Sequence, residues 1–280
     1  MLLYHYCNLN TFIEILKSHK VRFCDITKSN DRLETLYFLD CLEKYLKKTD
    51  SVILRSKQVR IIWENILSQY NYYCFCLSSN GDLLSQWRGY ARSGGVSIGF
   101  DKKELKKYSN SIKSINQPSN HSDLHHYKPN NPIQVKYYDQ QNIEKKVFEQ
   151  QDFQNHFTEE DFYYIIDHLP MFKHPSFKEE KEYRIYFGNY LSDRNQATPW
   201  VEFDGKMIDL QFLLSESEIK FFYEIPFPVS ALREIIIGPN CNLSEFEIMT
   251  LLSKFFGNDP DFPPSFVATL SVQKSKCPFQ

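Results

Sequence analysis

A run of six apolar residues without a charge, at positions 72 to 77, constrains the fold more than any other feature of this chain. The run is Tyr72-Tyr73-Cys74-Phe75-Cys76-Leu77, and it ends at the turn-like Ser78-Ser79-Asn80-Gly81. Its length suits a strand, and apolar side chains in both phases are typical of a strand that is buried on both faces. We therefore predict a central strand here, inside a sheet that other elements cover.

Short strand patterns and amphipathic helix patterns follow one another irregularly along the rest of the chain. A strand at 2–6 leads directly into a helix with Asn8 as its N-cap. Further helices are expected around 33–46, 59–67, 144–150, 159–168 and 244–255, with a short one containing Trp87, and further strands around 21–24, 96–100, 133–138, 183–187, 200–203, 219–225, 234–237 and 266–272. Because strands and helices do not alternate regularly, we predict an α+β fold with a mixed, largely antiparallel central sheet and peripheral helices.

Chain length and local composition bear on the domain organisation. A chain of 280 residues could form one large domain or two small ones. Residues 102–131 are rich in Ser, Asn, Lys and His, which is typical of a surface excursion rather than a linker. We predict a single domain over 1–280 with a polar surface insertion at about 102–131.

Overall composition limits the class of protein and its partners. Apolar residues make up 42% of the chain, which is too many for a disordered protein. The 33 Lys and Arg nearly balance the 35 Asp and Glu, so no global charge favours nucleic acid or an anionic membrane. No stretch approaches the roughly 18 apolar residues that span a bilayer, and the first residues lack a signal-peptide pattern. We expect a cytoplasmic protein with no membrane partner.

The seven cysteines are an odd number, and we interpret them as reduced core thiols. The alternative is a zinc site that combines cysteines with His121, His125 and His126. No CxxC pair or HxxxH spacing supports that site, so we expect no metal.

His5 is the first candidate for chemistry. Strand alternation puts Tyr4 and Tyr6 on one face and His5 on the other. Histidine changes its charge near neutral pH and can serve as an acid or a base. The alternative, a hydrogen-bonded structural histidine, is the commoner case and stays open.

A charged segment at the start of a predicted strand is the second candidate. Lys173-His174-Pro175 precedes Glu179-Glu180-Lys181-Glu182-Tyr183-Arg184. Alternation puts Glu180, Glu182 and Arg184 on one face, where a carboxylate pair beside a guanidinium can tune acid or base behaviour. The alternative is a solvated run of charges.

Ser78, Trp87 and Tyr90 form the third candidate cluster, directly after the predicted central strand. Trp87 and Tyr90 are three residues apart, on one helical face. Aromatic rings beside a hydroxyl suit a flat ligand ring, and the same pair could equally be core. The usual nucleotide, hydrolase and metalloprotease motifs are absent from the sequence.

The ordered set of these segments resembles one bacterial family, which is catalogued only as domain of unknown function twenty-nine seventy-one. The matching segments are Leu3-Tyr4-His5-Tyr6, Asn30-Asp31 with Glu34, Phe75-Cys76-Leu77-Ser78, Trp87 with Tyr90, Gly95-Val96-Ser97-Ile98-Gly99-Phe100, Lys173-His174-Pro175, Glu180-Lys181-Glu182-Tyr183-Arg184 and Ile235-Ile236-Ile237-Gly238-Pro239. The resemblance spans nearly the whole chain.

The opening strand and helix also look like those of DNA-targeting and tRNA-processing ADP-ribosyltransferases. That resemblance implies a split mixed sheet that holds NAD, the substrate, in a central cleft. It further implies that Glu182 binds the nicotinamide ribose and stabilises the oxocarbenium-like centre, with Glu180 upstream in an ExE pair. Arg184 would bind the pyrophosphate through its planar fork.

The same resemblance assigns the remaining cofactor-binding residues. His5 would hydrogen-bond the ribose of the adenosine half, with Tyr6 beside it. Ser78 would support the cleft, and Trp87 or Tyr90 would cover the nicotinamide. We therefore expect His5 and Glu182 to approach each other across one cleft with one of these two aromatic rings on its wall.

Three functions are compatible with the sequence. The first is an NAD-dependent ADP-ribosyltransferase, an effector or toxin in bacterial stress or anti-phage defence. Its acceptor would be a protein or a nucleic acid, and an operon-encoded partner fits that role. The second is a metal-independent nuclease or phosphodiesterase that uses His5, His174 and Arg184. The third is a non-catalytic nucleotide-binding sensor or assembly subunit.

Overall fold

The computed structural model describes residues 1–26, 33–48, 70–92, 94–114, 131–150, 168–190, 200–214, 218–257 and 269–278. The helix expected at 59–67 and nearly all of the one at 159–168 lie outside these residues. His121, His125 and His126 also lie outside them, as do Asn30 and Asp31.

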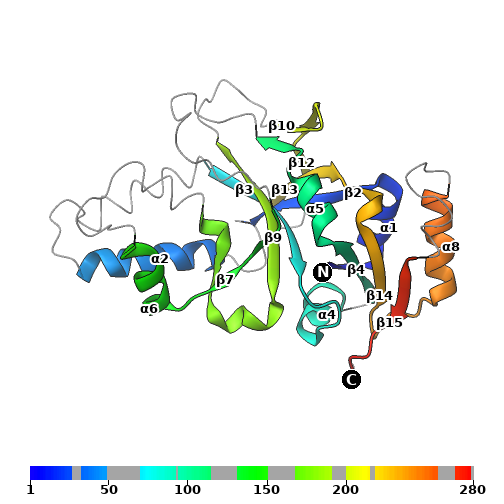
Figure 1. Ribbon diagram of the computed structural model, residues 1–280, viewed down its shortest axis with the longest axis horizontal. Coiled ribbons are helices and arrows are strands. Elements are labelled where there is room, and N and C mark those ends of the chain that lie inside the picture. Colours follow the sequence, from blue (N-terminus) through cyan, green and yellow to red (C-terminus); the bar gives the residue numbers. More distant parts are fainter. Residues whose placement is uncertain are drawn as a thin grey trace.

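A large mixed sheet forms the centre of the protein (Figure 1). Its strands are β1 (Leu2–Asn8), β2 (Lys20–Asp25), β3 (Tyr70–Ser78), β4 (Gly95–Asp101), β6 (Ile133–Gln134), β9 (Glu182–Tyr190), β12 (Gln211–Leu214), β13 (Ile219–Pro226), β14 (Leu232–Ile237) and β15 (Ser271–Lys274). The order is β12-β13-β2-β3-β1-β4-β14-β15, with β9 beside β3 and β6 beside β9. In this sheet β14 and β15 run parallel and the other pairs are antiparallel. The predicted α+β class with a mixed, largely antiparallel sheet is confirmed.

The sheet splits along one side of β3. On the other side, β3 pairs with β9 over its whole length. On the split side, β2 pairs with β3 only at Tyr73 and Cys74, and β1 pairs with it only at Ser78. β1 then follows β4 instead, from Leu2 to Asn8. Within the described residues, the stretch of β3 around Cys76 therefore has no strand partner on that side.

The helices cover both faces of this sheet. α1 (Leu9–Ser18), α5 (Lys102–Ser109) and α8 (Glu245–Phe256) contribute to the larger core, while α2 (Leu33–Lys48), α6 (Gln140–Ile143) and the π-helix η2 (Glu144–Phe148) contribute to a second core on the opposite face. Figure 1 shows α1 and α8 at one end of the molecule and α2 and α6 at the other. Among the described helices, none has the length and apolar character needed to cross a membrane.

β3 is buried on both faces, as the sequence predicts. Tyr73, Phe75 and Leu77 belong to the larger core. Tyr72 and Cys74 belong to the second core. Cys76 lies on the same face of β3 as Tyr72 and Cys74. It is exposed because the second core does not extend as far as this residue.

The predicted entry from the first strand into a helix is confirmed. The Asn8 side chain accepts a hydrogen bond of 2.9 Å from the backbone N–H of Thr11 and so caps α1. α8 begins with a capping box in which Ser244 and Glu247 exchange hydrogen bonds with each other's backbone.

The prediction of a polar surface insertion is wrong for residues 102–114. These residues form α5 and β5 (Ile112–Ser114), and the side chains of Leu105, Tyr108 and Ile112 lie in the larger core. Two apolar residues at i and i+3 suffice to bury one face of a two-turn helix, whatever the polarity of the rest. Residues 115–130 lie outside the described part of the chain.

Several short elements complete the fold, and of these the strand at 200–203 and the short helix around Trp87 were expected from the sequence. β5 joins β10 (Trp200–Phe203) and β11 (Lys206–Asp209) in a three-stranded sheet, and β7 (Lys136–Tyr137) pairs in parallel with β8 (Phe172–Lys173). The expected strand at 133–138 is thus divided between β6 and β7, and the expected helix at 144–150 begins earlier, with α6. Short 3-10 helices lie at η3 (Leu169–Met171), η4 (Pro175–Glu180) and η5 (Val229–Ala231), and the helix around Trp87 is α4 (Leu84–Tyr90).

Candidate functional site

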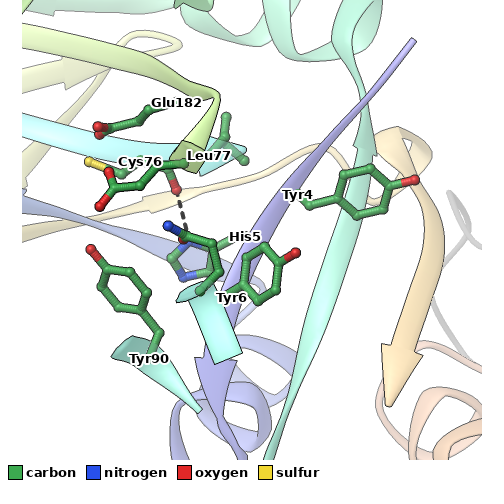
Figure 2. A pocket seen from close by; sticks show the side chains of 9 residues that line it. Tyr4, His5, Tyr6, Cys76, Leu77, Tyr90 and Glu182 are labelled. Carbon is green, nitrogen blue, oxygen red and sulfur yellow. Dashed lines mark hydrogen bonds between the residues drawn. The ribbon is translucent and has the colours of Figure 1, made fainter. Parts of the chain in front are cut away.

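A small pocket lies where β1, β3, the start of β9 and α4 meet. Its volume is about 50 Å³, and we call it the glutamate pocket (Figure 2). It is lined by Tyr4, His5, Tyr6, Cys76, Leu77, Gln86, Tyr90, Glu180 and Glu182. His5 and Glu182, which are far apart in the sequence, thus line one pocket, as expected.

A larger hollow of about 380 Å³, which we call the groove, continues from the glutamate pocket across the split in the sheet. The two hollows share His5, Tyr6, Cys76 and Tyr90. The groove is further lined by Cys7, Asn8, Thr11, Arg22, Cys24, Asp25, Ile26, Cys74, Leu213, Lys220, Phe221 and Phe222. It therefore extends from the four residues that it shares with the glutamate pocket to basic and aromatic side chains of β2 and β13.

Cysteines contribute to the wall of this groove. None of the seven cysteines, all of which lie in the described part of the chain, forms a disulfide. Cys24 and Cys76 are exposed, so the interpretation of all cysteines as core thiols is wrong for these two. At these two positions β2 and β3 face the groove and are not covered by a core.

His5 lies at the split itself. Its Nδ1 is 3.1 Å from the carbonyl oxygen of Cys76, and because a carbonyl only accepts, Nδ1 carries the proton. The ring also packs at 4.9 Å from Phe75. Burial lowers the pKa of His5, and the hydrogen bond that Nδ1 donates to the Cys76 carbonyl raises it by less. His5 is therefore a neutral ring whose Nε2 can accept a hydrogen bond.

We expect NMR to detect this tautomer directly. Long-range 1H–15N spectra should show a protonated Nδ1 and an unprotonated Nε2 for His5 at pH 7, with titration below the ordinary value of 6.5. The variant His5→Gln identifies the signal by its loss. A protonated Nε2 at pH 7 would contradict this tautomer, and a pKa above 6.5 would contradict the effect of burial on the ring.

Four charged side chains, which we call the ion cluster, lie around the start of β9. Arg184 Nε donates to Glu182 Oε1 at 2.7 Å, and its Nη2 donates to Glu182 Oε2 at 2.9 Å. Lys173 Nζ lies 2.7 Å from Glu180 Oε2 and 3.4 Å from Glu182 Oε2. Lys173, Glu182 and Arg184 are buried. The alternative of a solvated charge run is therefore wrong for these three residues.

The ion cluster keeps Glu182 ionised. Burial alone would raise the pKa of its carboxyl, but the charges of Arg184 and Lys173 and the hydrogen bonds from Arg184 outweigh burial and lower the pKa to about 2. The backbone N–H of Glu182 also donates to the hydroxyl of Tyr137 at 2.7 Å. The carboxylate is thus fixed in place at the pocket.

Arg184 lies behind Glu182 and does not line the pocket. Only 2% of its surface is exposed, and its Nη1 donates to the carbonyl of Pro170 at 2.8 Å. Strand alternation puts Glu182 and Arg184 on the same face of β9. Glu182 is at the end of the strand and reaches the pocket, whereas other residues cover this face at Arg184. The expected role of Arg184 in binding pyrophosphate is therefore not supported, and its contacts make it a positioning residue for Glu182.

Of the two aromatic candidates, Tyr90 lies on the wall and Trp87 does not. Trp87 is fully buried, and its ring meets Tyr6 edge-on at 4.7 Å. Tyr90 is 49% exposed at the C-terminal end of α4, where the helix no longer packs on the sheet. Figure 2 shows its hydroxyl directed toward the side of the pocket on which Glu182 lies. Burial of this hydroxyl, and then the nearby Cys76 and Glu182, raise the pKa of Tyr90, so it stays protonated.

The segment before α4 is tied to the end of the chain by Asp82. The Asp82 carboxylate accepts from Trp87 Nε1 at 2.7 Å, from Ser275 Oγ at 2.5 Å and from the backbone N–H of Lys276 at 2.7 Å. These hydrogen bonds help to lower the pKa of Asp82 despite its partial burial. The helix that carries Tyr90 is thereby fixed.

Comparison with known proteins gives one match. Residues 86–185 match the model of a family described as a protein of unknown function, DUF2971. The resemblance to DUF2971 is confirmed. The matched part is narrower than the nearly complete span expected, and no curated protein and no solved structure matches the chain. The further resemblance to ADP-ribosyltransferases stays a prediction.

The part that matches DUF2971 contains much of the site. Tyr90, the ion cluster and Tyr137 lie inside it, whereas His5 and Ser78 precede it. Ser78 is buried, and its Oγ donates to the carbonyl of Glu180 at 2.7 Å, so it fixes the segment that carries the glutamates. Its expected role as a support of the NAD cleft stays a prediction.

His174 lies within the part that matches DUF2971 but outside both hollows. Its Nδ1 bonds to Ser176, and its ring meets Tyr37 edge-on at 4.9 Å. Because Arg184 is buried behind Glu182, the structure does not bring the expected nuclease set of His5, His174 and Arg184 together.

Several residues of the groove were not identified from the sequence. Cys76, Arg22 and Lys220 line the groove and Gln86 lines the glutamate pocket, but nothing in the local patterns of Arg22, Lys220 and Gln86 distinguishes them. For Cys76 the sequence does give a signal. Alternation places it on the same face of β3 as Tyr72 and Cys74, at the end of the strand, where the second core no longer covers that face.

Proposed function

We propose that this protein is an NAD-dependent ADP-ribosyltransferase that holds NAD across the split in its sheet. The observation that carries the proposal is that His5 and Glu182 line one pocket at this split, with Tyr90 on the wall. Ligand sites are concave and combine an apolar wall with a few convergent polar groups, and the glutamate pocket has this composition.

The charge of the glutamate pocket supports binding of the nicotinamide end of NAD. The nicotinamide ring of NAD is cationic, and Glu180 and Glu182 supply carboxylates on one side while Tyr90 supplies an aromatic face. The Nε2 of His5 is an acceptor that a ribose hydroxyl can reach from within the same pocket.

The transfer would proceed by cleavage of the bond between the ribose C1′ and the nicotinamide nitrogen. The electron pair of that bond leaves with nicotinamide, and positive charge develops on the ribose. The ionised Glu182 would stabilise this charge, because a fixed carboxylate in a site of low dielectric acts without reorganisation. A nucleophile of the acceptor then bonds to C1′ and loses its proton.

The biological setting of the proposal comes from the resemblance. It includes an effector or toxin role in bacterial stress or anti-phage defence, action in the cytoplasm, and a protein or nucleic-acid acceptor. An operon-encoded partner is compatible with such a role.

We expect Glu182→Gln to reduce nicotinamide release from NAD by 100-fold or more, about 3 kcal/mol of transition-state stabilisation. The assay measures free nicotinamide after NAD and the purified protein are added to a cell extract that contains protein, RNA and DNA. The extract supplies the acceptor, whose identity the assay does not require.

Two controls accompany this assay. Glu202→Gln removes a carboxylate whose 3.0 Å pair with Lys113 lies on the surface, and it should leave release unchanged. Circular dichroism must show that Glu182→Gln is folded, and His5→Gln gives a second test of the pocket. Absence of release by the unmodified protein, or full release by a folded Glu182→Gln, would exclude the transferase.

A second candidate is a nucleotide-binding sensor without catalysis. It is favoured by the ion cluster, in which both oxygens of Glu182 are bound by Arg184. A carboxylate that is already neutralised is a weaker stabiliser of a developing cation. This candidate predicts NAD binding by calorimetry with no nicotinamide release.

A further inference from the structure

The end of the groove remote from Glu182 is basic and aromatic. Arg22 of β2 lies over the ring of Phe222, with its Cζ at 4.6 Å from the ring centroid. Lys220 of β13 lines the groove beside it, together with Phe221 and Leu213. β2 and β13 pair so that Cys24 faces Phe222, which places Arg22, Lys220 and Phe222 on one surface, and Leu213 of β12 lies opposite Lys220.

Both cations have carboxylate partners that a ligand can displace. Arg22 Nε lies 3.0 Å from Glu224 Oε1, with side chains 33% and 29% exposed. Lys220 Nζ lies 3.2 Å from Glu218, with side chains 42% and 20% exposed. Ion pairs this open to solvent contribute only about 0–1 kcal/mol. Phosphate oxygens bind arginine in a bidentate manner, and so they can compete with such partners at little cost.

The glutamate pocket and the groove differ in the size of ligand that each can hold. The glutamate pocket, at about 50 Å³, has room for only a small part of a ligand. The groove, at about 380 Å³, is within the range of about 300–1,000 Å³ that is typical of small-molecule sites. The remaining carboxylate of the groove, Asp25, is buried and pairs across the sheet with Tyr73, nearer the split than the basic end.

The geometry points to a nucleoside diphosphate subsite at the β2–β13 end of the groove. The diphosphate lies against Arg22 and Lys220, and the base packs on the apolar surface of Phe222 and Leu213. The inference rests on the proposed function for the identity of the whole ligand, NAD, because it assigns the adenosine diphosphate half to this end. Binding at this end requires no bond cleavage.

The test is isothermal titration of the purified protein with ADP as the probe. We expect measurable binding, and we expect Arg22→Ala and Lys220→Ala each to weaken it by 10-fold or more. Arg22→Lys keeps the charge but loses the planar fork, so it should weaken binding by less than Arg22→Ala. Lys113→Ala, which removes a cation paired with Glu202 on the surface, is the matched control and should bind ADP normally.

The outcomes distinguish this subsite from the proposed transfer. Glu182→Gln should bind ADP as the unmodified protein does. If ADP binds through Arg22 and Lys220 but no nicotinamide is released from NAD, the subsite stands and the transferase fails. If ADP does not bind, or binds both alanine variants as tightly as the unmodified protein, the subsite is wrong even where nicotinamide release is observed.

Discussion

Replacing Arg184 with methionine is expected to destabilise the protein by about 3–5 kcal/mol. The substitution removes the partner of both Glu182 oxygens and the donor to the Pro170 carbonyl, and it leaves a carboxylate buried beside Lys173 alone. Equilibrium unfolding in urea, followed by circular dichroism, measures the change in the free energy of unfolding.

Two comparisons show that the effect comes from buried charge. Lys113→Met breaks an ion pair on the surface and should cost less than about 1 kcal/mol. The double variant Glu182→Gln/Arg184→Met removes both charges. Its loss in the free energy of unfolding should therefore be smaller than the sum of the losses of the two single variants. Strict additivity would show that the Arg184–Glu182 pair is not coupled.

The same pair gives a pH dependence with a defined sign. The pKa of Glu182 is about 2 in the folded protein and near 4.5 when unperturbed, so its ionised form stabilises the fold above pH 4.5. That contribution is lost as the pH falls from 4.5 toward 2. The loss should be smaller in Arg184→Met, where the cause of the depressed pKa is weakened.

Trp87→Ala should reduce the free energy of unfolding by about 3–5 kcal/mol. The indole is fully buried, it contacts Tyr6, and its N–H donates a hydrogen bond to the Asp82 carboxylate. It also packs on Gly238, where an added Cβ would lie 2.9 Å from Trp87 Cζ3. Urea unfolding again measures the change.

Tyr90→Ala is the matched control, since it changes an aromatic residue of the same helix. Because Tyr90 is about half exposed, its removal should cost no more than about 1 kcal/mol. It should nevertheless weaken ligand binding in the glutamate pocket, whereas equal stability losses for the two variants would contradict the assignment of Trp87 to the core and Tyr90 to the wall.

The sheet strands were predictable where burial repeats locally. β3 and β9 show this best, because alternate side chains along each strand enter opposite cores. The seven-residue helix α4 shows the limit: Trp87 and Tyr90 share a helical face, but α4 ends at Tyr90, so only Trp87 is covered. The composition of 102–114 was misleading, because the polar residues of α5 hide the buried positions Leu105 and Tyr108.

The site was predictable only in part. His5 and Glu182 stand at strand positions that the sequence makes conspicuous. The ion cluster was expected only as a row of charges, since a sequence does not show that Arg184 is buried and bound to Pro170 of η3. The basic end of the groove depends on pairing between Arg22 and Glu224, which are 202 residues apart, and no local pattern encodes such a contact.

The hydrogen bond between Asp82 and Ser275 has a consequence for the order in which the protein matures. The two residues are 193 positions apart, and a ribosome adds about 5–20 residues per second. Roughly 10 to 40 s thus pass between synthesis of Asp82, just before α4, and synthesis of Ser275. A nascent chain therefore carries His5, Tyr90 and Glu182 before α4 is secured, and the pocket is complete only after translation has passed residue 276.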